Sequence, residues 1–326
     1  MTFLKKYYKY IIIYIVILMA LLIEFPYYID APGGIIDINN RISIENSYKS
    51  SGSLNLAYVS EYKATAFTLL ISLFNKDYKV MSKKDSIPKN VQEKDAEFRD
   101  RIMLEESYSN AIYLGYTKAN KEINVKSEKI YVNTIFEEAE TDLKVGDQII
   151  AINDIKVNNK KDIDNLFKEY QVGDIVNITV IKNRKEQKRT AKLINYDDKA
   201  IIGISLSLVR EMETIPDIKI NYKARESGSS GGLMLSLAIY NQLTKEDITK
   251  GRIIVGTGTI DEDGNVGSIG GVEYKLKSAV KSKADIFLVP NGKNYKAAIA
   301  LKKKKGYKIK IVGVSTFDEA LEYLKK

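Results

Sequence analysis

The sequence of 326 residues contains no cysteine, no histidine and no tryptophan. Without cysteine, the chain has no thiol nucleophile, no disulfide and no cysteine ligand for a metal. Without histidine, it lacks the usual general base near neutral pH and the commonest metal ligand. A Ser-His-Asp triad is therefore excluded. The remaining nitrogen base is lysine, whose pKa must be lowered by burial or by neighbouring charges before it can accept a proton.

The glycine-rich segments lack the two common nucleotide-binding patterns. A Walker loop needs GxxxxGK followed by Ser or Thr, but Gly292-Lys293 is followed by Asn294 and lacks the leading glycine. A Rossmann fingerprint needs GxGxxG, but the segment that begins at Gly256 has Asp261 in place of the third glycine. We therefore expect no ATPase module in this chain, no cofactor and no metal.

Lysine and arginine number 51 against 42 aspartates and glutamates, which gives a formal net charge of +9. The lysines are scattered and no arginine-rich face appears, so we expect no nucleic-acid partner. Attraction to an anionic membrane or wall surface is one alternative function for a cationic chain. The length predicts two or three domains.

Residues 1–30 begin with a lysine-containing stretch, followed by an uncharged run from Tyr10 to Ile23. With its flanking tyrosines, this run approaches the roughly 20 residues that cross a bilayer. The lysines place the amino terminus in the cytoplasm and everything after Pro26 outside it. We therefore expect a retained single-pass transmembrane helix in the cell membrane. A cleaved signal peptide is the alternative, although no A-x-A site follows the run.

Residues 31–110 mix short β-like runs at 54–59, 64–74 and 78–81 with a charged, helical stretch around 91–111. No pattern in this region indicates chemistry. The sequence predicts a structural module next to the membrane.

Residues 111–197 contain the string LKVGDQIIAIND at 143–154. Its Gly-Asp turn, alternating apolar residues and tight Asn-Asp turn predict a strand and a hairpin. An amphipathic helix at 160–170 and a second hairpin through Asn183-Arg184 follow. Another small β domain with a Gly-Asp turn is the alternative to the following resemblance.

This pattern resembles PDZ domains, which bind an extended peptide at a sheet edge. The resemblance implies a carboxylate-binding loop before the receiving strand, at Tyr113, Leu114, Gly115 and Tyr116.

Residues 198–326 alternate strand-like and helix-like segments, which favours an α/β or α+β domain. Within them, the string ESGSSGG at Glu226–Gly232 directly precedes an apolar run from Leu233 to Tyr240. A simple turn with helix-capping serines explains this string without any function. The functional alternative is a nucleophile elbow, in which Ser230 is exposed beside backbone N–H groups that stabilise an oxyanion. Gly228 and Gly231 would then let the substrate backbone approach closely.

The base for such a serine must be a lysine at the border of an apolar helix face. In the helix expected at 272–283, the apolar face contains Val272, Leu276, Ala279 and Val280. Lys275 lies roughly 85° from the centre of that face, whereas Lys277 and Lys281 point further away. Lys275 is therefore the best candidate for partial burial and a lowered pKa.

Two motifs resemble those of Lon-type serine proteases. Gly228-Ser229-Ser230-Gly231-Gly232 resembles their GPSAG nucleophile motif, and the string IGGVEYK at 269–275 resembles their IGGLKEK motif. The resemblance implies Ser230 as the nucleophile, Lys275 as the general base and Thr257 as a supporting hydroxyl, with an acyl-enzyme intermediate. Ser229 replaces the family proline and Gly231 the family alanine, both with small residues.

The whole chain resembles the membrane-anchored, PDZ-containing Lon-like proteases of Gram-positive bacteria. The resemblance implies a multidomain α+β fold: an anchor at 1–30, a membrane-proximal module at 31–110, a PDZ domain at 111–197 and a Lon-type protease domain at 198–326. It implies an ATP-independent extracytoplasmic endopeptidase that cleaves secreted peptides or small membrane-tethered proteins, and assembly of several copies in a ring. An inactive PDZ adaptor that binds peptides at the membrane is the alternative.

Overall fold

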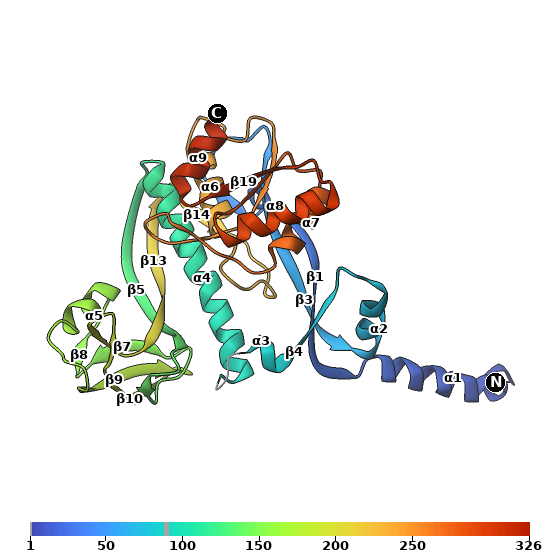
Figure 1. Ribbon diagram of the computed structural model, residues 1–326, viewed down its shortest axis with the longest axis horizontal. Helices are drawn as coiled ribbons and strands as arrows, with labels where there is room; N and C mark the ends of the chain where they lie inside the picture. The colour runs from blue at the N-terminus through green and yellow to red at the C-terminus, as the bar shows by residue number, and fades with distance from the viewer. Residues whose placement is uncertain (1, 88–90) are drawn as a thin grey trace.

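The computed structural model describes residues 2–87 and 91–326. A six-stranded sheet lies at the centre of its larger part (Figure 1). Its strand order is β19-β18-β15-β3-β1-β4. Strands β3, β15, β18 and β19 are parallel, whereas β1 and β4 join antiparallel. The strands are β1 (Glu24–Asp37), β3 (Ser53–Thr65), β4 (Lys79–Ser82), β15 (Ile253–Gly256), β18 (Ile286–Pro290) and β19 (Lys310–Val314).

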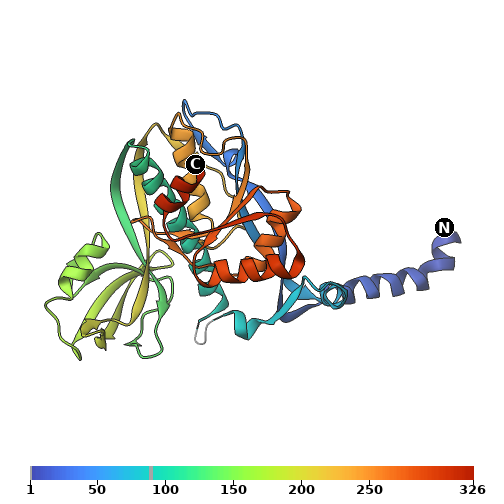
Figure 2. The ribbon, with the colours of Figure 1, turned by 45° about the horizontal axis from the view of Figure 1, so that its top comes forward.

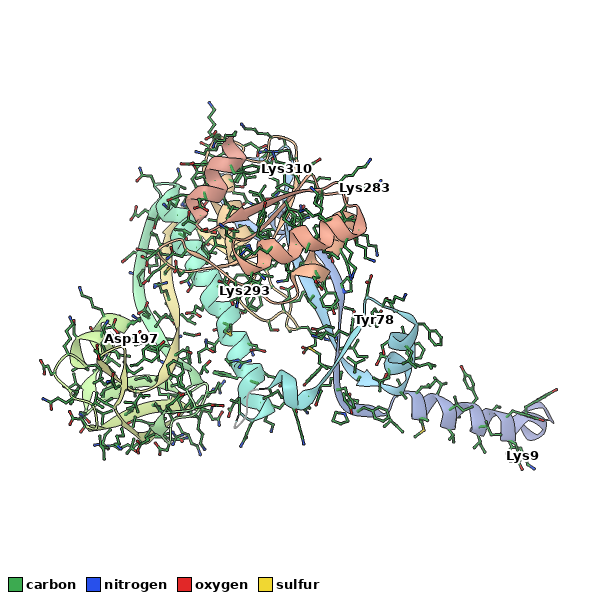
Figure 3. All side chains as sticks on the ribbon, in the orientation of Figure 1. Lys9, Tyr78, Asp197, Lys283, Lys293 and Lys310 are labelled. Carbon is green, nitrogen blue, oxygen red and sulfur yellow. The ribbon has the colours of Figure 1, made fainter. Side chains whose placement is uncertain are left out.

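Helices cover both faces of this sheet, as the short and fully apolar strand β18 requires. One face packs on α4 (Glu93–Lys118), α6 (Gly232–Leu243) and α9 (Phe317–Lys325), around buried Leu54, Leu237 and Leu288. The other packs on α7 (Val272–Lys281) and α8 (Lys293–Lys305), around buried Ala57 and Phe287. The outer surface carries charge, including the exposed lysines labelled in Figure 3: Lys283, Lys293 and Lys310.

The separate module that we expected at 31–110 is not what the structure shows. Strand β3 lies between β15 and β1, so this region supplies strands to the same sheet as residues 253–314. The physical reason is that β3 has a fully buried side chain on each face of the sheet. Leu54 packs in the core on one face, and Ala57 packs in the core on the other. The β-like run at 64–74 is mostly helix α2 (Ala66–Phe74), which Thr65 caps.

The amino-terminal helix α1 (Thr2–Leu21) corrects the expectation of a transmembrane anchor and of a single-pass location in the cell membrane. Among the residues that the structure describes, no helix combines the length and the hydropathy that crossing a bilayer requires. Beyond Lys9, α1 continues only from Tyr10 to Leu21, about 18 Å at 1.5 Å per residue. A hydrocarbon core is roughly 30 Å thick, and the chain enters β1 at Glu24.

A second sheet forms the smaller part of the molecule (Figure 2). Its strand order is β13-β5-β7-β9-β10-β6. The Gly-Asp and Asn-Asp turns lie where the sequence predicts them, with positive φ at Asn153 and Asp154 between β7 and β8. The elements are β5 (Glu122–Ile135), β6 (Glu140–Thr141), β7 (Gln148–Ile152), β8 (Ile155–Lys156), α5 (Lys160–Leu166), β9 (Ile175–Lys182), β10 (Lys185–Lys192) and β13 (Ile204–Ile215).

Short elements complete these two parts. They are η1 (Ile38–Asn40), α3 (Lys83–Ser86) and three small antiparallel pairs: β2 (Ile42–Ile44) with β14 (Ile218–Ile220), β11 (Ile194–Tyr196) with β12 (Lys199–Ile201), and β16 (Thr259–Ile260) with β17 (Val266–Gly267). In the chain, the pair β16–β17 lies between strand β15 and helix α7.

The carboxylate-binding loop that we expected at Tyr113–Tyr116 is instead part of helix α4, which ends at Lys118. Leu114 and Tyr116 are buried, and the Tyr116 hydroxyl donates to the Pro216 carbonyl over 2.6 Å. A Cβ on Gly115 would lie 2.6 Å from Ile239 Cγ2, so this glycine lets α4 approach α6 closely. The receiving strand β5 begins only at Glu122.

Candidate active site

The loop before α6 places Ser230 at the amino end of a buried helix. Gly228 has φ +83°, a left-handed conformation that favours glycine, and Gly231 is the N-cap of α6. Helix α4 holds the loop: the Gly228 N–H donates to the Asp100 carbonyl over 3.0 Å, and the Ser107 hydroxyl donates to the Ser229 carbonyl over 3.0 Å. The side chain of Ser230 is only partly covered.

Helix α7 delivers the lysine to this loop. It begins at Val272, after Gly271 at φ +66°, and its buried face contains Leu276 and Ala279. Lys275 lies in the first turn and is 3% exposed. Burial lowers the pKa of Lys275 from 10.5 to about 8, because an ammonium group loses its hydration there.

Three side chains meet at one point. Lys275 Nζ lies 2.8 Å from Ser230 Oγ and 2.9 Å from Thr257 Oγ1. The Thr257 hydroxyl donates to the Ser230 carbonyl over 3.0 Å, and the Gly258 N–H donates to the same carbonyl over 2.8 Å. Thr257 is fully buried and follows β15 directly. Its contacts therefore hold both Lys275 and the Ser230 loop at the end of this strand.

The hydrogen bonds of Thr257 determine where the lysine lone pair points. The single hydroxyl hydrogen of Thr257 is used on the Ser230 carbonyl, so its oxygen acts as an acceptor toward Lys275 Nζ. A neutral Lys275 therefore directs an N–H at Thr257 and has its lone pair available for the Ser230 Oγ–H. This is the arrangement that a general base needs.

Groups that stabilise negative charge lie beside the same serine. Among the described residues, no acceptor is found for the backbone N–H groups of Ser230 and Gly231. Both lie at the amino end of α6, where the helix dipole favours an anion. Gly231 also faces Leu56, whose Cδ2 would lie 2.9 Å from an added Cβ. Leu56 thus takes part of the space of the methyl group that the family alanine would carry.

A hollow of about 700 Å³ lies beside the segment that precedes Ser230, and its lining on this segment ends at Ser227. It is lined by β1, β3, the first half of α4 and the segment 222–227, and its charged side chains have both signs. Glu226 fixes that segment, since its carboxylate pairs with Arg41 over 2.7 Å and accepts from the Lys223 N–H. The hollow is large enough to admit a peptide chain.

Of the residues that the sequence singled out, the structure brings together Ser230, Lys275 and Thr257, with Gly228, Ser229 and Gly231 on the same loop. It does not place Tyr113–Tyr116 in a loop, as described above. Sequence reasoning missed Ser107 and Asp100, which hold the loop from α4. No local signal could have identified them, because they lie more than one hundred residues away in the chain. Among the described residues, no cluster of ligands suits a metal ion.

Comparison with known proteins finds a family match for one part of the chain. Residues 217–325 match the Lon protease (S16) C-terminal proteolytic domain. This Lon-matched segment contains Ser230, Thr257 and Lys275, but neither β3 nor α4. No curated protein matches the sequence.

Two solved structures are each similar to about a quarter of the chain. The PDZ domain of the SdrC-like protein from Listeria monocytogenes is 23% identical, with 24% of this chain and 85% of that chain covered and a TM-score of 0.22. A solution structure from Geobacillus thermodenitrificans is 24% identical, with 24% and 98% covered and a TM-score of 0.22.

Proposed function

We propose that this protein is a serine endopeptidase that uses a Ser-Lys dyad. The observation that carries the proposal is the 2.8 Å contact between Ser230 Oγ and Lys275 Nζ, an amine whose pKa is lowered to about 8. The match of residues 217–325 to a Lon proteolytic domain supports a serine peptidase. In a chain without histidine, this lysine is the base available to the serine.

The reaction follows from the geometry. Ser230 Oγ attacks the peptide carbonyl and its proton passes to Lys275 Nζ, while the N–H groups of Ser230 and Gly231 stabilise the oxyanion. The resulting ammonium gives its proton to the leaving amine, which breaks the peptide bond and leaves an ester on Ser230. A water molecule then loses a proton to Lys275 and attacks the ester, which releases the acid and restores the hydroxyl. Thr257 acts as a positioning residue by directing one N–H of the amine away from Ser230.

The substrate is an extended peptide or an unfolded protein. The sequence contains no Walker loop, so we infer cleavage without ATP. We infer that the second sheet, from β5 to β13, belongs to a PDZ-like domain that holds peptides in a second hollow, of about 570 Å³, between β5 and the start of α5. Strand β5 supports this because it pairs with β7 only around Ile130 and Tyr131, which leaves its earlier residues free on that edge.

Hydrolysis of unfolded casein by purified variants tests the dyad. Ser230→Ala and Lys275→Ala are each expected to lower the rate by at least about 10³-fold, because removing one member disables the unit. Lys281→Ala is the matched control, since Lys281 lies exposed at the end of the same helix. Circular dichroism establishes that the variants are folded.

Retained turnover in a folded Ser230→Ala or Lys275→Ala protein would refute the proposal. Ser229→Ala distinguishes the two neighbouring hydroxyls, and loss of activity there with an active Ser230→Ala would move the nucleophile by one residue. A wild-type protein that binds casein peptides but never cleaves them would favour a peptide-binding adaptor instead.

A further inference from the structure

Arg210 of β13 is a buried cation that the proposed chemistry does not use. Its side chain is 6% exposed, and its guanidinium contacts four residues from three segments: helix α4, strand β5 and the turn between β16 and β17. One nitrogen donates to Asn110 Oδ1 of α4 over 2.7 Å, and Nε lies 3.2 Å from Glu128 Oε1 of β5. The third nitrogen pairs with Glu262, in the turn between β16 and β17. The guanidinium also lies 5.4 Å from the centre of the Tyr113 ring.

On one side, these contacts lead to the serine loop. The Asn110 side chain, which accepts from Arg210, donates to the Ile260 carbonyl over 3.1 Å. Ile260 packs against the start of α6, because a Cβ on Gly232 would lie 2.7 Å from Ile260 Cγ2 and 2.9 Å from Ser107 Oγ. Ser107 lies one helical turn before Asn110 and holds the Ser229 carbonyl.

The second contact on this side leads to the lysine. Glu262 lies in the turn that connects β16 to β17, and the chain continues from β17 directly to Gly271 and α7. Arg210 therefore restrains, through Asn110 and Glu262, the segments that carry both members of the dyad.

On the other side, the contacts lead to the second hollow. Glu128 lines the hollow between β5 and α5, and its other oxygen accepts from the Lys160 N–H at the start of α5 over 3.0 Å. A peptide that enters along the free edge of β5 meets this carboxylate. Glu128 is 10% exposed, so a change in its position is transmitted to Arg210 rather than absorbed by water.

We propose that Arg210 is a positioning residue that couples the hollow between β5 and α5 to the reactivity of Ser230. The inference rests on the proposed Ser-Lys peptidase function. Only a planar guanidinium bonds Asn110, Glu128 and Glu262 at the same time, and a lysine ammonium at this position is a point charge without that fork. Occupation of the hollow shifts Glu128, Arg210 follows, and the supports of the serine loop and of α7 shift with it.

The rate of covalent modification of Ser230 by a fluorophosphonate probe tests this coupling. Arg210→Lys is expected to lower that rate and the kcat for casein about tenfold, with KM little changed, because the dyad is displaced but the binding hollow is intact. The pH midpoint near 8 is expected to persist, since the burial of Lys275 is untouched. Arg184→Lys is the matched control, because Arg184 lies exposed at the turn between β9 and β10.

Glu128→Gln tests the link to the hollow. It is expected to lower the modification rate about threefold alone and to add nothing in the Arg210→Lys background, because both variants break one path. A folded Arg210→Lys protein modified at the wild-type rate would overturn the proposal, and so would effects of the two variants that multiply. A purely structural role predicts a lower unfolding temperature with an unchanged modification rate.

Two further comparisons keep the outcome clear. If Arg210→Lys fails to fold, Glu128→Gln and Glu262→Gln are combined in its place. A combined effect smaller than the product of the two supports Arg210 as their common link, and a full product contradicts it. If wild-type protein is not modified on Ser230, the proposed function itself fails, whereas wild-type modification without any effect of Arg210 defeats only the coupling.

Discussion

At the scale of single residues, the proposed chemistry depends on the amine of Lys275. Its neighbours at hydrogen-bonding distance are two neutral hydroxyls, those of Ser230 and Thr257, which do not stabilise an ammonium group as a carboxylate would. With burial lowering the pKa of Lys275 to about 8, about one tenth of the protein carries the neutral base at pH 7. The same burial of a charged amine lowers the free energy of unfolding of the protein.

Lys275→Met is expected to stabilise the protein at pH 7 by on the order of 2 kcal/mol, because it removes an amine that is charged and buried there. The pKa of Lys275 is about 8 in the folded protein against an ordinary value of 10.5. Between these values the unfolded chain binds more protons than the folded one, so wild-type stability rises with pH. The advantage of the variant should therefore shrink across this window.

Urea unfolding of both proteins at several pH values between about 7 and 10.5 measures this difference. A difference in the free energy of unfolding that stays constant with pH would show that Lys275 does not titrate in this window.

At the scale of elements, the start of α7 sets the position of the lysine. Gly271 adopts φ +66°, and its carbonyl accepts the first helical hydrogen bond from the Lys275 N–H over 3.1 Å. A Cβ on Gly271 would lie 2.6 Å from Val59 Cγ2 of β3. The glycine therefore lets α7 begin directly against the sheet.

Gly271→Ala is expected to lower kcat about tenfold and to reduce stability by about 1 kcal/mol or more, because it combines a left-handed alanine with a steric clash. Gly270→Ala is the matched control, since nothing lies within 4 Å of an added Cβ there. Casein hydrolysis and thermal unfolding measure both effects. Equal activity of the two variants would show that the close contact with Val59 does not position the lysine.

The elements that the sequence predicted correctly are those defined by local chemistry. The hairpin at Asn183 and Arg184 has both residues at positive φ. The prediction of a β-like run at 64–74 was wrong, because continuous apolar residues fit a strand and a helix equally well. It forms helix α2, in which no residue is buried, so no packing pattern distinguished the two.

At the scale of the whole molecule, the proposed active site depends on segments that lie about two hundred residues apart. Strand β3 pairs in parallel with β15, with Ser53 opposite Ile253 and Leu56 opposite Gly256. Helix α4, which covers one face of this sheet, holds the serine loop through Ser107 and Asp100. The Lon-matched segment 217–325 contains neither element.

A fragment of residues 198–326 is accordingly expected to lack both casein hydrolysis and cooperative unfolding, because β15 would become an exposed edge and the α6 face would lose its cover by α4. A fragment of residues 24–326 retains both parts and is the control. Casein turnover and thermal unfolding of the two fragments are compared to test this expectation. An active and cooperatively folded 198–326 fragment would show that β3 and α4 are dispensable.

The long-range pairing explains what the sequence alone could not show. Motifs and helical spacing within one segment of the chain were enough to predict Ser230, Thr257 and Lys275. Ser107 and Arg210 were not, because their partners Ser229 and Asn110 are far away in sequence and a buried serine or arginine has no local signature. The same limit hid the place of β3, whose alternation indicates a strand but not its neighbours.

The pH dependence of Ser230 modification by a fluorophosphonate probe, followed by mass spectrometry from about pH 6 to about pH 10, tests the central claim most directly. The account predicts an adduct on Ser230 whose rate of formation rises with pH around a midpoint near 8, as the amine of Lys275 loses its proton. This rise should be absent in Lys275→Ala. A rate that is independent of pH, or equal in Lys275→Ala and wild-type protein, would contradict it.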